Sequence, residues 1–556
     1  VGDCAVACAF VSYCGPFNQE YRSYCIVDKY SSECETRHVP VTQNLNIIEF
    51  LADIGTIGDW NQEGLPTDPL SIQNGILVTR SSRFPLLIDP QGQAVGWITC
   101  REKERLPAAS PTVQLLDPKI KDKLEFAMQE GKAFIVLGVE NEIDPMFDPV
   151  LEKEYVQKGR RYIITISDKQ MDYDMNFMAY FITRLPNPTF SPELQAKTTV
   201  VDFTVTQKGL EEQLLGKVIG KEQKALEDQL ALVLQEVNAN TKSLLALDAS
   251  LLERLTSNTG NLLDDEELVD VLASTKAKAQ EVGEKLKAAD ETKISINEKR
   301  EQFRPVATRG SCLYFAIVEM SAVNPMYQTS LAQFLGLFMS SMDKAERASL
   351  ASKRVENIID TMTYITYRYI NRGLYEKDKL TFILICTLKI LVTAGLLKGG
   401  DVTLFLRGGA ALDINTAKRK PFGWMTNDSW LNILALADAL KFFANMPSDM
   451  AANESIWRKW YEDNEPEQLA IPDYETRISE NVEIGPFLRL LVVRMLRMDR
   501  CILQARDFIK STAQMGPRFV EPVTDTMEMT YDESCAEVPT IFLLSAGVDP
   551  TESIEL

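Results

Sequence analysis

The chain has 556 residues, of which 45% are hydrophobic and 25% charged, and this length is enough for roughly two to four domains with cores of their own. Its formal net charge of −20 argues against a protein that grips nucleic acid or an anionic membrane, because both surfaces would repel it. With His38 as its single histidine, the chain is not expected to be a histidine-based hydrolase.

Five of the ten cysteines lie within the first 34 residues, but no pair has the C-x-x-C spacing of a zinc site. Reduced, buried thiols are expected and no metal site is predicted. The run from Cys4 to Phe17 lacks the basic stretch that precedes a signal peptide, and Leu380 to Leu397 contains Lys389, so both are predicted to be buried helices. Because the chain starts at Val1 and stops at Leu556, where a helix should begin, both ends are expected to be cuts through a longer polypeptide.

Residues 1–73 read as a helical lead-in, and residues 74–206 alternate short apolar runs with helical stretches. Such alternation is typical of a largely parallel sheet with helices on its faces. The apolar runs expected in this region are Ile76 to Val78, Phe84 to Ile88, Ala133 to Val139, Tyr162 to Ile166, Met178 to Thr183 and Thr199 to Phe203.

The stretch from Asn74 to Ile98 predicts a strand, a tight turn and a helix, which is the frame of a phosphate-binding loop. A working loop needs several glycines so that backbone N–H groups can wrap the phosphates, then a lysine for the outer phosphates and a serine or threonine for Mg²⁺. Here the turn has one glycine and no lysine, and Gln93-Ala94 stand where Lys-Ser or Lys-Thr should be. The residues of this vestigial phosphate loop are Asp89, Pro90, Gln91, Gly92, Gln93 and Ala94.

Four separated words resemble the dynein heavy chain, in the part of the motor that follows the microtubule-binding stalk: GDCAVACAFVSYCGPFNQEYR, GLPTD, NGILVTRSSRFPLLIDPQGQA and LPNPTFSPELQAKTTVVDFTVT. The resemblance covers almost the whole chain. It implies an α/β AAA+ (P-loop-like) core with a small helical lid domain, an inserted antiparallel coiled-coil hairpin and the beginning of a second AAA+ module. In the motor ring of the family these are the fifth module, its strut or buttress, and the start of the sixth. FGWMTNDSW and GVENEIDPMFDP look more like axonemal, outer-arm heavy chains than the cytoplasmic form.

The resemblance also locates the other parts of a nucleotide site, and they are degenerate. In the metal-holding strand, Gly138 stands where the family pattern has the Mg²⁺-holding Asp. Glu140 then has no metal to act with, and a solvated strand end is expected there. Thr183 falls at the place of a γ-phosphate sensor. Lys197 falls near the place of an arginine finger, but a lysine lacks the planar, bidentate group that a finger uses.

From Gly209 the apolar residues recur at alternating steps of four and three, which is a heptad seam. The first seam is Leu226, Leu230, Val233, Val237, Asn240, Leu244, Leu247 and Leu251; the second is Leu268, Leu272, Thr275, Ala279, Val282, Leu286, Ala289, Lys293, Ile296, Arg300 and Phe303. With a short break at Ser257 to Asn261, the two seams predict an antiparallel hairpin over 207–304 that projects roughly 60 Å. Its polar seam residues either fix the register or let it slide or bend, and a fixed spacer between domains is the alternative.

Residues 305–400 are predicted to be helical and to form the lid, and residues 401–556 a helical connection to the next module. The start of that module is predicted from a second strand, turn and helix: Thr540 to Leu544, Ser545 to Pro550, and Thr551 onward. Its turn contains Gly547, Asp549 and Pro550 and again has no Gly-Lys-Ser or Gly-Lys-Thr. Two disabled versions of one frame indicate tandem modules of one architecture.

The resemblance implies a non-hydrolysing ring segment of an ATP-driven microtubule motor, which relays conformational change through the strut to the stalk. No cofactor or metal is expected in this segment, whereas ATP and Mg belong to other modules of the parent chain. The expected partners are neighbouring AAA+ modules and the stalk of the same heavy chain, other dynein heavy, intermediate and light chains, and the microtubule through the stalk outside this segment; no nucleic acid and no membrane are expected. The expected location is the cytoplasm and cytoskeleton, in the axoneme of a cilium or flagellum. Two alternatives are a coiled-coil scaffold protein with an α/β binding module and an active nucleotide hydrolase.

Overall fold

The computed structural model describes residues 1–107, 111–159, 161–166, 169–257, 266–409, 419–521, 526–534, 536, 539–542, 544 and 546–555, apart from the side chains of 251, 254–257, 266–275, 278, 532, 533 and 553. The chain divides into two compact units. The first consists of Val1–Tyr314 and Thr329–Ile359, and the second of Phe315–Gln328 and Asp360–Leu556. The domain boundaries expected from the sequence, after residues 73, 206, 304 and 400, stay predictions.

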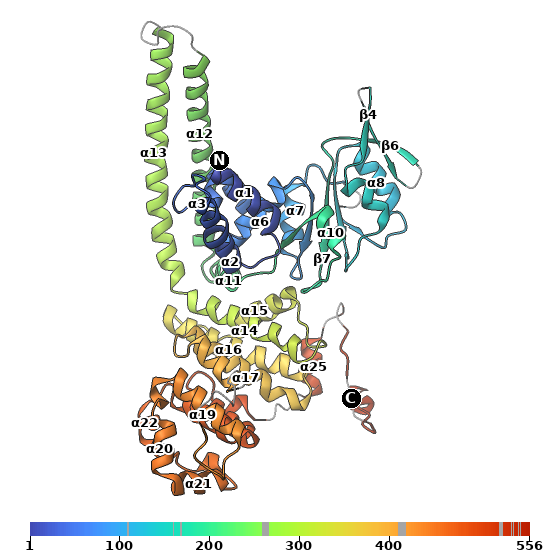
Figure 1. The fold of residues 1–556 in the computed structure, drawn as a ribbon. Coiled ribbons are helices and arrows are strands. Elements are labelled where there is room, and N and C mark those ends of the chain that lie inside the picture. Colours follow the sequence, from blue (N-terminus) through green and yellow to red (C-terminus); the bar gives the residue numbers. More distant parts are fainter. Residues whose placement is uncertain are drawn as a thin grey trace. The chain divides into compact units, whose positions relative to one another are not determined.

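A parallel sheet forms the centre of the first unit (Figure 1). Its described strands are β1 (Phe84–Ile88), β2 (Val113–Gln114), β3 (Ala133–Leu137), β7 (Met178–Thr183) and β8 (Thr198–Asp202). They are arranged in the order β2-β3-β7-β1-β8, and every neighbouring pair is parallel. The predicted parallel sheet is confirmed. β1 and β3 are apolar throughout because both faces of the sheet are covered.

The regular elements of residues 1–73 are all helices, and their role as a separate lead-in stays a prediction. These elements are α1 (Gly2–Tyr13), α2 (Gln19–Tyr24), the π-helix η1 (Cys25–Ser31), α3 (Ser32–Thr36), α4 (Ile47–Leu51), α5 (Ile54–Gln62) and the first residues of α6 (Pro69–Arg80). α5 starts at its own cap, because the Asp53 carboxylate accepts the Thr56 N–H at 2.8 Å. This cap separates α5 from α4 and sets its direction, which matters for the contacts of α5 described below.

The expectation of a strand-like run at Ile76 to Val78 was wrong, because these residues lie in α6. The helix begins at Pro69, with the Asp68 carboxylate accepting the Ser71 N–H at 3.2 Å. Ile76, Leu77 and Val78 are all buried in the helix. A helix that is covered on most sides carries consecutive apolar residues, which periodicity alone does not distinguish from a short buried strand.

Tyr162 to Ile166 does not join the parallel sheet either, which corrects a second expectation. It belongs to β5 (Arg161–Ile166), the middle strand of a separate antiparallel sheet with β4 (Tyr155–Lys158) and β6 (Lys169–Tyr173). β4 and β5 follow each other too closely in the sequence for the crossover that parallel strands require, so they can pair only as antiparallel strands.

The parallel sheet separates two hydrophobic cores, because successive residues of a strand face opposite sides. Leu87 of β1 contributes to one core together with residues of α1, α6 and α7 (Gln93–Arg101). Leu86 contributes to the other together with residues of α8 (Ile120–Gln129), the 3₁₀ turn η2 (Pro145–Phe147) and α9 (Asp148–Leu151). The turn between β1 and α7 therefore lies at the carboxyl end of an inner strand, in a sheet whose two faces are both packed.

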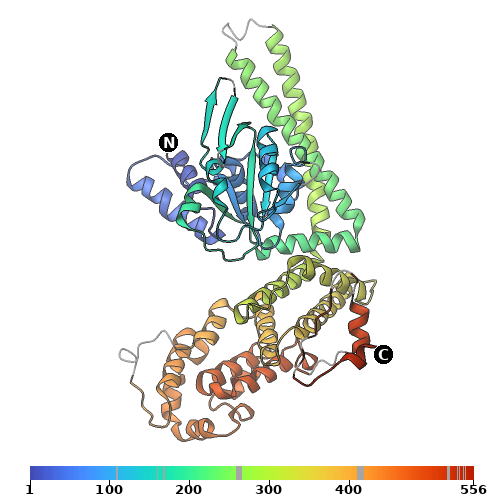
Figure 2. The ribbon, with the colours of Figure 1, turned by 90° about the vertical axis from the view of Figure 1, so that its right-hand side faces the viewer.

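Three helices follow the sheet and the short α10 (Pro192–Lys197): α11 (Gln207–Glu222), α12 (Lys224–Ser257) and α13 (Glu266–Glu301). α12 and α13 lie side by side, as Figures 1 and 2 both show. Their described seam positions are buried or half-buried, including Leu230, Val237, Leu244, Val282, Leu286 and Ile296. The side chains of Leu251 and Leu272 lie outside the described residues. α12 has 34 residues, which corresponds to about 50 Å of helix.

The helices after the long pair are α14 (Arg304–Val323), α15 (Leu331–Lys344), α16 (Ala351–Arg372), α17 (Glu376–Thr393) and α18 (Gly399–Arg407). The apolar run Leu380 to Leu397 lies largely in α17, whose Phe382 and Ile390 are buried. No helix in the described part of the chain is long and apolar enough to cross a membrane.

The regular elements in the other described residues of the second unit are helices. They are α19 (Asn427–Ala439), η3 (Lys441–Phe443), α20 (Met446–Ala452), α21 (Glu454–Glu462), η4 (Pro466–Gln468), α22 (Glu475–Glu480), α23 (Gly485–Leu496), η5 (Met498–Arg500), α24 (Cys501–Ser511), η6 (Pro517–Phe519), α25 (Met527–Glu533) and α26 (Thr551–Glu555).

The strand expected at Thr540 to Leu544 is not formed by its described residues, 540–542 and 544. The Ile541 side chain is 79% exposed, and no described strand lies beside this segment to pair with its backbone groups. Residues 543 and 545 lie outside the described residues. The helix expected from Thr551 is found as α26.

Candidate nucleotide site

The turn after β1 is held by a carboxylate of the chain itself. Asp89 is 0% exposed, and its carboxylate accepts the N–H groups of Gln93 at 2.8 Å and Val95 at 3.0 Å in the first turn of α7. Gly92, with φ +79°, makes the turn that brings these N–H groups round to Asp89. In a working phosphate loop, the N–H groups at this helix start bind phosphate oxygens. Here the N–H groups of Gln93 and Val95 already bind the Asp89 carboxylate.

Burial raises the pKa of Asp89 above its ordinary value, while the N–H groups of Val95 and Gln93 act in the opposite direction. The turn is also fixed by its other polar side chain. The Gln91 carbonyl oxygen accepts the Val205 N–H at 3.4 Å, and Gln91 is hydrogen-bonded to the buried Tyr314 hydroxyl of α14. The residues of the vestigial loop are thus bound to their own sheet and to α14.

Thr183, expected at the place of a γ-phosphate sensor, is brought next to the turn by the pairing of β1 with β7. Its carbonyl oxygen accepts the Asp89 N–H at 2.9 Å, and its hydroxyl accepts the Leu185 N–H at 3.2 Å. The side chain is fully buried. The structure therefore brings Asp89 and Thr183 together. The polar atoms of both residues are hydrogen-bonded to groups of the chain itself.

Gly138 follows directly after β3 and has φ +76°, a conformation that an aspartate adopts only with strain. A Cβ at this position would lie 3.0 Å from the Gln114 side-chain oxygen. Glu140, two residues further on, is exposed to solvent. Between them the Val139 N–H donates to the Ile182 carbonyl at 3.2 Å. Position 138, where the family pattern has the metal-holding carboxylate, therefore carries no side chain.

Lys197, expected near the place of an arginine finger, is surrounded by carboxylates of its own chain. Its ammonium lies 2.7 Å from Glu193, 2.9 Å from Glu152 and 3.1 Å from Asp148. Hydrogen bonds with Glu193, Glu152 and Asp148 raise the pKa of Lys197 above its ordinary value. A charge that is already shared among three acids is poorly placed to stabilise a phosphate of another module.

The second turn, at the end of the chain, is exposed. Gly547 has φ +87°, and the Asp549 carboxylate accepts the Thr551 N–H at 3.0 Å at the start of α26. Pro550 lies between them. Hydrogen bonds from the side chain and backbone of Thr551 lower the pKa of Asp549 below its ordinary value. No group of three or more metal-binding side chains occurs among the described residues of the chain.

Two contacts that the sequence did not predict surround α12. At its start, Glu227 lies 3.5 Å from Arg300 of α13, which gives the polar seam residue Arg300 a partner on the facing helix. Further along, α5 lies against α12, and Asp59 binds Asn238 and Lys242. Glycines at positions 55 and 58, one helical turn apart, are the only sequence signal that could have pointed to this second contact.

A family model described as the ATP-binding dynein motor region matches residues 58–282, which include the parallel sheet, α11, α12 and part of α13. This part of the chain is therefore an AAA dynein motor region with a mixed α/β core built on a parallel sheet.

Similarity over the whole chain indicates the type of dynein. The chain is 48% identical over 556 residues to the dynein gamma chain of the flagellar outer arm of Chlamydomonas reinhardtii. It is 43% identical to dynein axonemal heavy chain 8 of Homo sapiens over 556 residues and to dynein axonemal heavy chain 5 of Mus musculus over 554 residues. Each alignment covers 100% of this chain and 12% of the relative. The chain belongs to the dynein heavy chain family, as a segment of an axonemal heavy chain.

The predicted family and axonemal type are confirmed by these similarities, and the flagellar and axonemal names of the relatives agree with the predicted location in a cilium or flagellum. The alternative of a coiled-coil scaffold protein with an α/β binding module is not supported by these similarities. The chain spans 12% of the length of these relatives.

Proposed function

We propose that this chain is a non-hydrolysing part of a dynein motor ring and that it transmits conformational change rather than nucleotide energy. On this proposal, residues 74–206 are the large core of the fifth AAA+ module, 305–400 its lid, and the end of the chain the start of the sixth. ATP and Mg act in other modules of the parent heavy chain. The microtubule is held by the stalk, outside this segment.

The position of the Asp89 carboxylate is the observation that carries the proposal. It accepts two N–H groups at the start of α7, where a phosphate would otherwise bind, and it is completely buried. A phosphate at this place would have to displace the carboxylate and would leave it buried without partners, which is costly. The glycine at 138 and the three acids around Lys197 support the same conclusion for the other parts of the site.

The proposed transmission element is the pair α12 and α13, as an antiparallel coiled-coil strut over residues 207–304. The low exposure of its described seam positions and the ion pair between Glu227 and Arg300 support a packed pair of helices. On this proposal, movement of the α/β core shifts the strut, which acts on the stalk of the same heavy chain. A distant hydrolysis site can bias such an element if the ring has two packings.

The test is nucleotide binding by the purified 556-residue chain. Extraction and calorimetry are expected to find no stoichiometric ADP or ATP and no turnover of Mg-ATP. Gln93→Lys with Ala94→Thr restores the missing side chains but keeps Asp89, and this variant should also stay empty. Adding Asp89→Gly frees the N–H groups of α7, and ATP binding is expected only then, in chains whose circular dichroism shows retained fold. Stoichiometric nucleotide in the unaltered chain, or turnover abolished by Glu140→Gln, would overturn the proposal.

A further inference from the structure

The contact between α5 and α12 is unusually close at two glycines. A Cβ at Gly58 would lie 2.5 Å from the side-chain oxygen of Asn238, nearer than such atoms can approach. A Cβ at Gly55 would lie 3.1 Å from Cγ of Lys242. Both glycines are inside α5, where glycine is less favourable than alanine for helix formation. Their presence is explained by the approach of α12, since a larger residue at position 58 would displace the Asn238 side chain.

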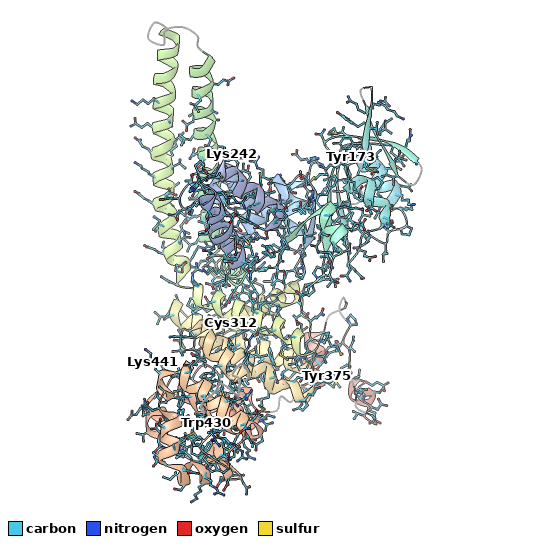
Figure 3. The ribbon with its side chains drawn as sticks, viewed as in Figure 1. Tyr173, Lys242, Cys312, Tyr375, Trp430 and Lys441 are labelled. Carbon is cyan, nitrogen blue, oxygen red and sulfur yellow. The ribbon has the colours of Figure 1, made fainter. Side chains whose placement is uncertain are left out.

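Polar contacts fix the same two helices relative to each other. The Asp59 carboxylate accepts the side-chain N–H₂ of Asn238 at 3.0 Å and the ammonium of Lys242 at 2.6 Å. Asn238 is only 9% exposed. Asn238 and Lys242 are four residues apart, so they lie on one face of α12. Figure 3 labels Lys242 beside the helices of the N-terminal region.

α5 is in turn part of the packed α/β core. Trp60, next to Asp59, is buried and contacts Trp97 of α7 with ring centroids 6.2 Å apart. Trp97 also stacks on Phe203, directly after β8, at 6.0 Å. α7 is the helix whose first turn binds Asp89. An unbroken series of contacts therefore runs from the vestigial phosphate turn through α7 and α5 to α12.

The second long helix has no such anchor among its described side chains. None of the hydrogen bonds and ion pairs of the described α13 side chains reaches residues 1–206. α13 is bound instead to α12, through Arg300 and Glu227. Immediately after α13, Arg304 binds Glu211 at 3.0 Å and Glu212 at 2.8 Å, both in α11.

We propose that Gly55, Gly58 and Asp59 are positioning residues that fix α12 on the α/β core, so that α12 and α13 move with this core as one lever. The lever's mechanical role rests on the proposed function, but the contact itself does not. The pair keeps one register at its base, and displacement of its far end follows rotation of the core rather than sliding of one helix along the other.

A cross-link between the two helices tests the contact. In Gly55→Cys with Lys242→Cys, the new sulfur at 242 takes the place of Lys242 Cγ, which lies 3.1 Å from the ideal Cβ at 55. A disulfide needs roughly 3 Å between one Cβ and the partner sulfur, as follows from its bond lengths. The oxidant is glutathione disulfide. The thiols of the two new cysteines react with one glutathione disulfide, which gives the cross-link and two glutathione molecules. Mass spectrometry of the peptides distinguishes this bond from reactions of the exposed Cys4, Cys8 and Cys100.

Adding Gly58→Ala to the cysteine pair is expected to slow cross-linking at least tenfold, because its Cβ pushes Asn238 away. The matched control is Gly283→Ala in α13, where an added Cβ meets nothing within 4 Å, and this change should leave the rate unaltered. Asp59→Ala in the cysteine-pair chain gives a second, independent slowing. Equal melting temperatures with different rates identify a positioning role. Failure to cross-link, or a rate insensitive to both Gly58→Ala and Asp59→Ala, would overturn the proposal.

The intact heavy chain separates the lever from the proposed function. With the cysteine pair in the full motor, the ratio of microtubule-stimulated to basal ATP turnover is expected to be the same before and after oxidation, because α12 stays on the core throughout the cycle. A loss of stimulation on oxidation, restored by reduction, would show that the contact opens and would overturn the single-lever inference. Nucleotide turnover in this segment would instead refute the proposed function and leave the cross-linking result intact.

Discussion

The turns at Asp89-Pro90 and Asp549-Pro550, which belong to the two predicted strand-turn-helix frames, lie in opposite environments. Asp89 is fully buried and its pKa is raised by burial, whereas Asp549 is exposed and its pKa is lowered by hydrogen bonds from Thr551. Both carboxylates accept N–H groups at the start of a helix. β1 is paired with β7 and β8, while the described residues before Asp549 pair with no described strand. In this chain, the carboxylate cap that follows a paired strand is buried, and the cap that follows no described strand is exposed.

The largest expected difference between the two turns is in stability. Asp89→Ala removes the acceptor of two buried N–H groups and should lower the free energy of unfolding of the first unit by about 3 kcal/mol, combining a lost cap with buried, unsatisfied donors. Amide hydrogen exchange of β1 and β7 measures this change. Asp549→Ala is the matched control and should leave exchange in the first unit unaltered. Equal effects of the two changes would mean that the Asp89 turn is not a closed site.

A smaller effect is expected from the link between the first turn and α14. Tyr314→Phe removes the buried hydroxyl that binds Gln91 and should destabilise the first unit by about 1 kcal/mol, the usual net value of one hydrogen bond. Tyr531→Phe, near the second turn and 80% exposed, is the control and should have no measurable effect. Thermal unfolding, followed by near-UV circular dichroism, compares the two. An unchanged thermal stability of Tyr314→Phe would mean that the hydrogen bond between Tyr314 and Gln91 does not stabilise the turn.

The smallest expected effect is an opposite pH dependence at the two aspartates. Because burial raises the pKa of folded Asp89 above 3.8, the folded chain keeps a proton there that the unfolded chain has lost. Its contribution to stability is therefore complete below pH 3.8 and declines as the pH rises through the raised pKa. For Asp549 the pKa is lowered, so its contribution is present above 3.8 and is lost as the pH falls.

Urea unfolding of the chain, of Asp89→Asn and of Asp549→Asn between about pH 3.5 and 6 measures the two differences. The difference in free energy of unfolding between the unaltered chain and Asp89→Asn should become smaller as the pH rises. The corresponding difference for Asp549→Asn should become smaller as the pH falls. Slopes of the same sign at both positions would contradict the contrast between a buried and an exposed turn.

The sequence predicted the central strands and helices well where the local pattern was strong. Phe84 to Ile88, the turn at Asp89 and the helix that begins at Gln93 were placed correctly. It failed at Ile76 to Val78 and at Tyr162 to Ile166. Three apolar residues suit a buried helix as well as a strand, and strand direction depends on which neighbours are within reach.

The contacts of the site were harder to foresee than its residues. That Asp89 faces the N–H groups of α7, and that Lys197 lies among three acids, depends on side chains brought together from different elements. The approach of α12 to Gly58 joins residues 180 positions apart in the sequence. No local pattern encodes such pairs, because each helix or strand forms the same way with or without its distant partner.

The sequence by itself determined the family, the alternation of strands and helices, the heptad spacing of the long helices and the absence of a lysine-bearing phosphate loop, since each is a matter of residue type and spacing along the chain. The tertiary structure decided that the turn at Asp89 is buried while the turn at Asp549 is exposed, and which helix holds α12. Burial and close approach depend on distant segments packing together, and only the folded chain excludes water from Asp89 or brings Asp59 within reach of Lys242.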